Sequence, residues 1–147
     1  MTWTKDQVLA FIQSPVPTRY RLIRPDSSQV YARCAMDALY FPLLSGEQVT
    51  LLARPPGMRE RLRVRLRPEG PDPWPEGWVI AYPDLPTVKP DPDSIARNIC
   101  PYVHLFPNAK AAEAWRQGLP AGLTARVRLL GFSAALAEAR LRVSLWP

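Results

Sequence analysis

The stretch Tyr31-Ala-Arg-Cys34-Ala-Met-Asp37-Ala-Leu-Tyr-Phe-Pro42 is predicted to carry the chain from the end of a strand into a helix. It is mostly apolar, and Pro42 is expected to stop the helix because proline has no amide hydrogen to donate. Within a helix, a spacing of three places the Cys34 thiol and the Asp37 carboxyl on one face. This stretch therefore predicts a helix that presents a thiol next to an acid.

Strands are predicted before and after this stretch. Residues 19–24 alternate in polarity, residues 48–53 are largely apolar, and residues 61–67 alternate arginine with leucine or valine. Such alternation is typical of a half-buried strand, here with a basic outer face. The remaining predictions from this pattern are strands over 78–82, 99–106 and 124–130 and Pro-rich loops over 68–77 and 83–94.

Short helices are predicted to flank the strands. Thr4 is expected to cap a helix within residues 1–14, and Asn108 a helix that ends at Gly118. Ser133 is expected to cap a last helix over residues 134–143. Strands mixed with short helices, without regular βαβ alternation, predict the α+β class with a mixed or antiparallel sheet and flanking short helices.

The composition indicates one domain that resides in the cytoplasm. The 147 residues are 47% hydrophobic, which is enough for a core, and include 18 prolines, which favour turns over long helices. No stretch resembles a signal peptide or reaches the ~18 apolar residues of a membrane helix. The net charge of +6 is interpreted as a solvated surface that favours anionic small molecules, including thiols.

Cys34, Asp37 and Cys100 are the candidate site residues, and spacing by itself leaves their role open. A carboxylate raises the pKa of a neighbouring thiol, so the pair suits an acid that handles a proton while sulfur binds a soft electrophile. Two thiolates can also clamp a soft ion such as Hg(II) or Cu(I). The alternative is that both cysteines are small core residues and the aspartate is exposed or a helix cap.

His104 is the only histidine, and the chain has no CxxC pair, so a four-ligand zinc site is disfavoured. In a strand, its even spacing from Cys100 would place both side chains on one face. The imidazole could be a ligand, a proton relay or a core group with satisfied hydrogen bonds, and the last interpretation is favoured.

Two motifs resemble the organomercurial (alkylmercury) lyases. Residues 31–42 resemble the family pattern Tyr-Ala-x-Cys-Ala-(apolar)-Asp-(small)-Leu-x-Phe-Pro. The segment Cys100-Pro-Tyr-Val-His104-Leu-Phe-Pro-Asn-Ala-Lys-Ala-Ala-Glu-Ala-Trp115 resembles the second cysteine segment of the family. The resemblance covers roughly residues 18–143.

The resemblance also implies a domain organisation. Members of the family usually carry an N-terminal winged-helix-like domain, whereas only about 17 residues precede the first core strand here. We therefore expect a short N-terminal helical arm over residues 1–17 and an alkylmercury-lyase-like catalytic domain over residues 18–147.

Cleavage of a carbon–mercury bond by protonolysis is the function that the resemblance implies, giving a hydrocarbon and Hg(II) in mercury detoxification and resistance. It assigns Cys34 and Cys100 as mercury-binding thiolates and Asp37 as the proton donor to carbon and a further candidate ligand. No organic cofactor is expected. The implied partners are an organomercurial substrate and, as acceptor of Hg(II), a cytosolic thiol or a mercuric reductase.

Three alternatives remain open at this point. The chain could be a thiolate-binding or chaperone protein for soft metals without turnover, although a pure chelator has little need of Asp37. The arginine-rich strand could contact phosphates, but no reading helix or aromatic platform for nucleic acid is visible. A relative with the same three residues could also act on organotin or organolead compounds.

Overall fold

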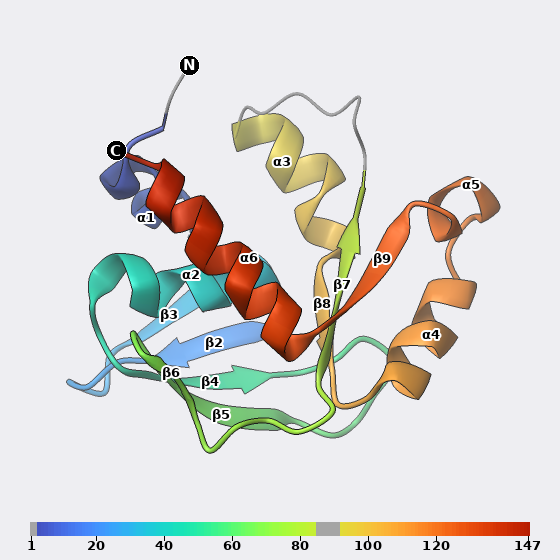
Figure 1. Ribbon diagram of the computed structural model, residues 1–147, viewed down its shortest axis with the longest axis horizontal. Helices are drawn as coiled ribbons and strands as arrows, with labels where there is room; N and C mark the ends of the chain where they lie inside the picture. The colour runs from blue at the N-terminus through green and yellow to red at the C-terminus, as the bar shows by residue number, and fades with distance from the viewer. Residues whose placement is uncertain (1–2, 85–91) are drawn as a thin grey trace.

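Two antiparallel sheets organise the fold, which the computed structural model describes for residues 3–84 and 92–147 (Figure 1). The larger sheet has the strand order β1-β3-β2-β4-β5-β6, and each of these neighbouring pairs is antiparallel. Its strands are β1 (Gln13–Ser14), β2 (Tyr20–Ile23), β3 (Gln29–Ala32), β4 (Val49–Ala53), β5 (Leu62–Arg67) and β6 (Gly70–Asp72).

The smaller sheet has the order β8-β7-β9, and it is also antiparallel. Its strands are β7 (Val79–Pro83), β8 (His104–Phe106) and β9 (Val127–Gly131). The helices are α1 (Lys5–Phe11), α2 (Ala35–Ser45), α3 (Pro92–Asn98), the 3₁₀ turn η1 (Cys100–Tyr102), α4 (Ala109–Gln117), α5 (Ala121–Thr124) and α6 (Phe132–Leu145).

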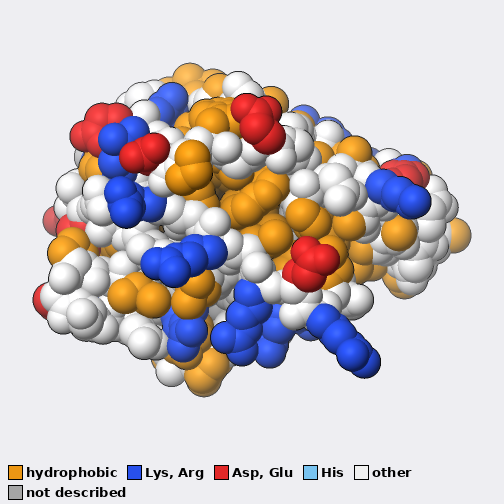
Figure 2. Space-filling view, turned by 90° about the horizontal axis from the view of Figure 1, so that it is seen from below, with side chains coloured by type: hydrophobic (Ala, Val, Ile, Leu, Met, Phe, Trp, Pro, Cys, Tyr) orange, Lys and Arg blue, Asp and Glu red, His pale blue; other side chains and the backbone are white. Residues whose placement is uncertain are grey.

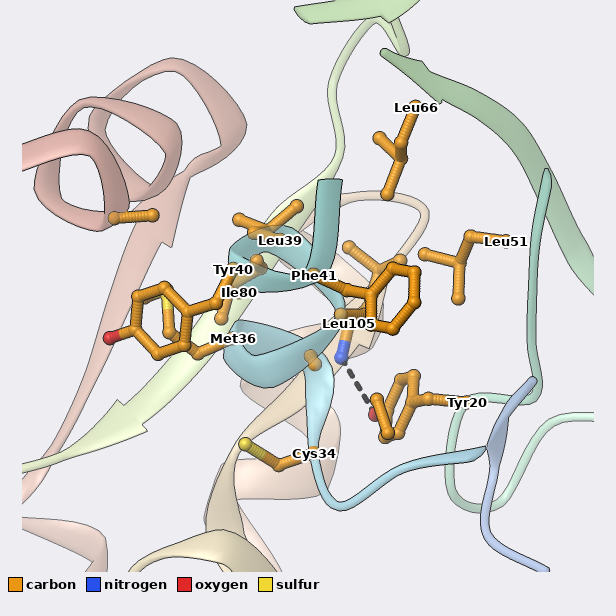
Figure 3. Packing of buried hydrophobic residues seen from close by; sticks show 14 of the residues in the cluster. Tyr20, Cys34, Met36, Leu39, Tyr40, Phe41, Leu51, Leu66, Ile80 and Leu105 are labelled. Atoms are coloured by element: carbon orange, nitrogen blue, oxygen red, sulfur yellow. Dashed lines mark hydrogen bonds between the residues drawn. The ribbon is translucent and has the colours of Figure 1, made fainter. Parts of the chain in front are cut away.

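Helix α2 is the centre of the core. It lies between the inner face of the larger sheet and helix α6, which cover most of its length (Figure 1). Every residue from Ala35 to Pro42 is therefore buried, as expected for a helix that is apolar all round. Figure 3 shows Tyr40 and Phe41 on opposite sides of this helix, with Phe41 facing Leu51 of β4.

The alternation in β5 confirms the predicted half-buried strand. Leu62, Val64 and Leu66 are buried against the core, whereas Arg63 and Arg65 are exposed on the opposite face of the sheet. The α+β class is likewise confirmed, with two antiparallel sheets where one mixed or antiparallel sheet was predicted.

Helix α2 does not stop at Pro42, so that prediction is wrong. The helix continues to Ser45, and Gly46 ends it with a left-handed φ of 72°, its N–H donating to the Pro42 carbonyl at 3.0 Å. Proline removes one hydrogen bond, to the carbonyl four residues earlier, and its ring is buried in the core here. Packing of the helix against its neighbours therefore offsets the lost hydrogen bond, and the helix continues past the proline.

Cys100 does not lie in a strand, because the extended segment begins only at His104. Pro101 occupies the second position of η1, and its fixed φ favours the first turn of a helix over a strand that needs an amide donor. The shared strand face that was predicted for Cys100 and His104 is therefore absent.

Other boundaries differ in smaller ways. Strand β6 lies within the predicted loop 68–77, and residues 92–94 of the second predicted loop belong to α3, while residues 85–91 lie outside the described residues. Ser133 lies inside α6, which begins after Gly131. The caps at Thr4 and Asn108 are confirmed by side-chain hydrogen bonds to Gln7 N–H and Ala111 N–H.

No helix within residues 3–84 and 92–147 has the length and apolar character that are needed to cross a membrane.

Tyr20 joins the two sheets through its hydroxyl group (Figure 3). The hydroxyl of this β2 residue accepts a hydrogen bond from the Leu105 N–H of β8 at 3.1 Å and lies 2.8 Å from His104 Nδ1. Since His104 Nε2 lies 2.9 Å from the Pro101 carbonyl, Nε2 carries the proton and Nδ1 accepts from the tyrosine. The interpretation of His104 as an imidazole with satisfied hydrogen bonds is therefore confirmed.

Replacing Tyr20 by phenylalanine should lower the free energy of unfolding by about 1–3 kcal/mol, because the buried Leu105 N–H loses its acceptor. Urea denaturation measures the change. Tyr31→Phe, at a half-buried tyrosine on the outer face of β3, is the matched control and should change stability by less. Equal effects of the two substitutions would contradict this role of Tyr20.

Candidate active site

Cys34, Asp37 and Cys100 converge at one point, although the second cysteine is far from the others in sequence. One sulfur from each cysteine and a carboxylate oxygen all lie within 4.8 Å of one another. The Cys100 thiol donates to Asp37 Oδ2 at a sulfur–oxygen distance of 4.0 Å. All three side chains are buried, with exposed fractions of 3%, 6% and 7%.

The backbone around the start of α2 produces this convergence. Cys34 is the N-cap, with extended φ and ψ of −153° and 177°, and Asp37 lies in the first helical turn. The Ala35 N–H donates to the Val103 carbonyl at 3.4 Å, and the Val103 N–H donates to the Cys100 carbonyl at 3.2 Å. These two bonds tie the η1 turn to the beginning of α2 and bring the second sulfur to the first.

Cys34 precedes the helix, so the prediction that it shares a helix face with Asp37 needs correction. An N-cap side chain points back over the first turn, toward the N–H groups of the residues two and three positions later. The spacing of three still places the thiol near the carboxyl, but through cap geometry. Asp37 also lies where the positive end of the helix dipole favours a negative charge.

Burial sets the protonation of the acid. It raises the pKa of Asp37 from its ordinary 3.8 to about 7, against the opposing effects of a hydrogen bond with Cys34 and the charges of Arg33 and Arg142. Burial also raises the pKa of the Cys34 thiol, and the hydrogen bond with Cys100 and the negative charge of Asp37 act in the same direction. The carboxyl group can therefore gain or lose a proton near neutral pH.

A cavity of about 400 Å³ opens beside the three residues. Its walls are largely apolar and come from segments at both ends of the described chain: Trp3, Val8, Phe11 and Ile12 on one side, and Ile95, Ile99, Val103 and Trp146 on others. Helix α1 is part of this wall, so residues from the expected N-terminal arm line the candidate site.

Arg142 brings a positive charge to the same cavity, and sequence reasoning missed it. Its Nη1 donates to the hydroxyls of Tyr40 and Tyr82 at 2.9 and 3.0 Å, and its Nη2 donates to Glu138 at 3.0 Å. Its spacing of four from Glu138 predicts only an ion pair within the helix, and the two tyrosines that it contacts come from α2 and β7. Only the packing of α6 across these elements places it at the site.

The remaining candidates are not part of the buried cluster of Cys34, Asp37 and Cys100. His104 holds hydrogen bonds to Tyr20 and Pro101, and burial lowers its pKa to about 4, so it is neutral at pH 7. The arginines of β5 lie on the outer face of the larger sheet. Figure 2 shows basic side chains on the face seen from below, interspersed with hydrophobic and uncharged groups, as in a solvated surface.

The sequence model of the MerB family, described as alkylmercury lyase, matches residues 14–136. The chain belongs to the alkylmercury lyase family. This match begins after α1 and includes both cysteines and the aspartate of the buried cluster, and it confirms the family that the two motifs indicated.

Relatives named alkylmercury lyase support the same assignment. Those from Bacillus cereus and Clostridium butyricum are each 32% identical over 111 residues, which are 74% of this chain and 47% of the relative. One from Staphylococcus epidermidis is 30% identical over 113 residues, 74% of this chain and 49% of the relative. The chain thus spans about half the length of the curated relatives that it matches.

A solved structure supports the fold. The crystal structure of the mercury-bound form of MerB2 superposes with a TM-score of 0.66, covering 90% of this chain and 61% of the other, at 18% sequence identity. This likeness confirms the alkylmercury-lyase-like architecture of the two sheets and their helices.

Stability should depend on pH through Asp37. The pKa of Asp37 is higher in the folded chain than in the unfolded one. The contribution of this carboxyl group to the free energy of unfolding is therefore fully present below about pH 4, and it is lost as pH rises through about 7. The difference between the two pKa values corresponds to about 4 kcal/mol. Asp37→Asn should remove this pH-dependent contribution. The free energy of unfolding of the variant, relative to that of the parent, should therefore increase by up to about 4 kcal/mol between about pH 4 and about pH 7.

Unfolding free energies from denaturant titrations across this pH range measure the effect. Asp84→Asn, at an exposed aspartate, is the matched control and should leave the pH profile nearly unchanged. Parallel profiles for the parent and Asp37→Asn would show that the carboxyl is not held in an apolar setting.

Proposed function

We propose that this chain is an organomercurial lyase that cleaves the carbon–mercury bond by protonolysis, with Cys34, Asp37 and Cys100 as its catalytic residues. The single observation that carries the proposal is the buried convergence of two thiols and one carboxyl beside an apolar cavity. A carbon–mercury bond needs soft ligands on mercury and an acid at carbon. These three groups supply both within 4.8 Å.

The first step is capture of mercury by sulfur. The Cys34 thiol displaces the small ligand X of a substrate R–Hg–X, giving R–Hg–S(Cys34), and X leaves with the thiol proton. Thiolate is the form of cysteine that binds metals, and mercury itself drives the loss of the proton. The raised pKa of Cys34 keeps this thiol protonated until the soft ion arrives.

The second step moves a proton by way of Asp37. The Cys100 thiol, which already donates to Asp37 Oδ2, gives its proton to the carboxylate and binds mercury as thiolate. The resulting carboxylic acid then protonates carbon, and the electron pair of the carbon–mercury bond forms the new carbon–hydrogen bond. The products are R–H and Hg(II) bound by two sulfurs, with no change in the oxidation state of mercury.

A pKa near 7 suits an acid with both roles in one cycle. At neutral pH the carboxyl group of Asp37 can accept a proton from a thiol and is acidic enough to return it to carbon. An aspartate at its ordinary pKa would be almost fully ionised at this pH. Burial in the apolar cavity therefore provides the protonation state that the reaction requires.

The cavity accounts for the organic part of the substrate. Its volume of about 400 Å³ exceeds what methyl or phenyl groups need, and its apolar walls favour hydrocarbon over water. The proposed partners are an organomercurial substrate and, for the product, a cytosolic thiol or a mercuric reductase. No organic cofactor takes part in the steps above.

Substitution of the three residues distinguishes the lyase from a chelator. Asp37→Asn should still bind Hg(II), since both sulfurs remain, but should release hydrocarbon at least about 10²-fold more slowly because the proton donor is gone. Cys34→Ser and Cys100→Ser should each reduce turnover to background, because a hydroxyl is a poor ligand for a soft ion. Headspace analysis of benzene or methane from phenylmercury or methylmercury with excess thiol gives the rates.

Two controls complete the experiment. Mercury stoichiometry shows whether each variant still binds the ion, and Ser144→Ala, at an exposed residue of α6, should keep the parent rate. Stoichiometric binding by the parent with no hydrocarbon would support a soft-metal chelator. Normal turnover by Asp37→Asn would refute the proton role.

A further inference from the structure

Cys100 lines two cavities, and the second differs from the first in having two arginines and no carboxylate among the described residues of its wall. The first is the apolar cavity described above, and the second has a volume of about 310 Å³. Of the three site residues, only Cys100 lines both, since Cys34 and Asp37 border the first alone. A molecule in either cavity therefore lies against the residue whose sulfur would hold the mercury ion.

The second cavity is positively charged. Arg19 and Arg33 line it, and no carboxylate among the described residues does. Neither arginine forms an ion pair with an acidic group in the described part of the chain, unlike Arg142, which is paired with Glu138. His104, also in this wall, is neutral at pH 7 because burial lowers its pKa to about 4.

Both guanidinium groups have N–H donors beyond those that form hydrogen bonds within the described residues. Arg33 donates through Nε to the Phe11 carbonyl, and Arg19 donates through Nη1 to the Arg54 carbonyl at 3.3 Å. Each guanidinium carries five N–H donors in a planar fork that matches the two oxygens of a carboxylate. Both side chains are half-buried, so water screens their charges less than it would on the open surface.

We propose that the second cavity binds the carboxylate of a small anionic thiol, whose sulfur takes Hg(II) away from Cys100. This proposal rests on the proposed function, because it concerns the mercury ion that carbon–mercury cleavage leaves behind. The carboxylate binds to Arg19 and Arg33, and this places the thiol of a short mercapto acid beside Cys100. Substrate and acceptor then occupy two different cavities that share Cys100 in their walls.

The chemistry is ligand exchange without oxidation or reduction. The incoming thiol R′–SH forms a sulfur–mercury bond as the bond from mercury to Cys100 breaks, and its proton passes to the Cys100 sulfur. A second R′–SH replaces Cys34 in the same way. The products are Hg(SR′)₂ and two free cysteine thiols, so the site returns to its starting state.

The experiment loads the protein directly with one equivalent of mercuric chloride, so it does not depend on carbon–mercury cleavage. Stopped-flow absorbance of the mercury–thiolate band then follows extraction of the ion by 3-mercaptopropionate, which is anionic, or by 2-mercaptoethanol, which is neutral. Replacing both Arg19 and Arg33 by glutamine should slow extraction by the anionic thiol on the order of tenfold. Extraction by the neutral thiol should change by less than about twofold.

Matched variants separate local from general charge effects. Arg63→Gln with Arg65→Gln removes the same charge from the outer face of β5 and should leave both rates unchanged. The single substitution Arg19→Glu leaves the hydrogen bond from Arg33 to the Phe11 carbonyl intact. Because it also reverses a charge, it should slow mercury extraction by the anionic thiol more than Arg19→Gln does. Propionate, which lacks sulfur, should compete with 3-mercaptopropionate in the parent protein and have no effect on 2-mercaptoethanol.

Two results would overturn the proposal. Equal slowing of both thiols, or of neither, by the Arg19 and Arg33 substitutions would show that the second cavity does not select an anion. A single-turnover burst of benzene from phenylmercury, measured in parallel, reports on cleavage alone. A normal burst with no dependence on thiol charge would therefore refute the acceptor site and leave the proposed lyase intact.

Discussion

The burial of one carboxyl group between two thiols is the constraint on which the rest of this structure depends. An ionised carboxylate in an apolar setting is costly unless its charge is compensated or neutralised. Asp37 has only partial compensation, from the N-terminus of α2, a thiol and the charges of Arg33 and Arg142. Its pKa is therefore close to neutral pH, so the carboxyl group can gain and lose a proton, and protonolysis of a carbon–metal bond requires such an acid.

Holding that carboxyl out of water places a demand on the central helix. Because α2 is covered by the larger sheet on one side and by α6 on another, its first turn can lie inside the molecule without exposing backbone to solvent. The same packing carries the helix past Pro42. A helix on the surface would present Asp37 to water and return its pKa toward 3.8. The fold and the proposed chemistry thus depend on the same buried helix.

The sequence predicted which side chains form the site better than it predicted how they are arranged. The spacing of three brought Cys34 and Asp37 together because a cap residue and the third helical residue are neighbours, just as two residues on a helix face are. Cys100 could be added only through the family motifs, since no local rule relates a residue 63 positions from Asp37 to its side chain. Its turn was missed because an apolar run favours a strand, whereas Pro101 favours a helical turn.

The walls of the two cavities could not be predicted, because they are built by packing between distant segments. The apolar cavity combines α1, α3 and α6, and the basic cavity combines the two arginines that flank β2 and β3 with the η1 turn. This division follows the chemistry of a carbon–mercury bond. In the proposed reaction the mercury carries a hydrocarbon group before cleavage, which apolar walls stabilise, and after cleavage it is an ion that exchanges between sulfur ligands near the two arginines. In the proposed cycle Cys100 serves both states, because it lines the apolar cavity and also the cavity that contains the two arginines.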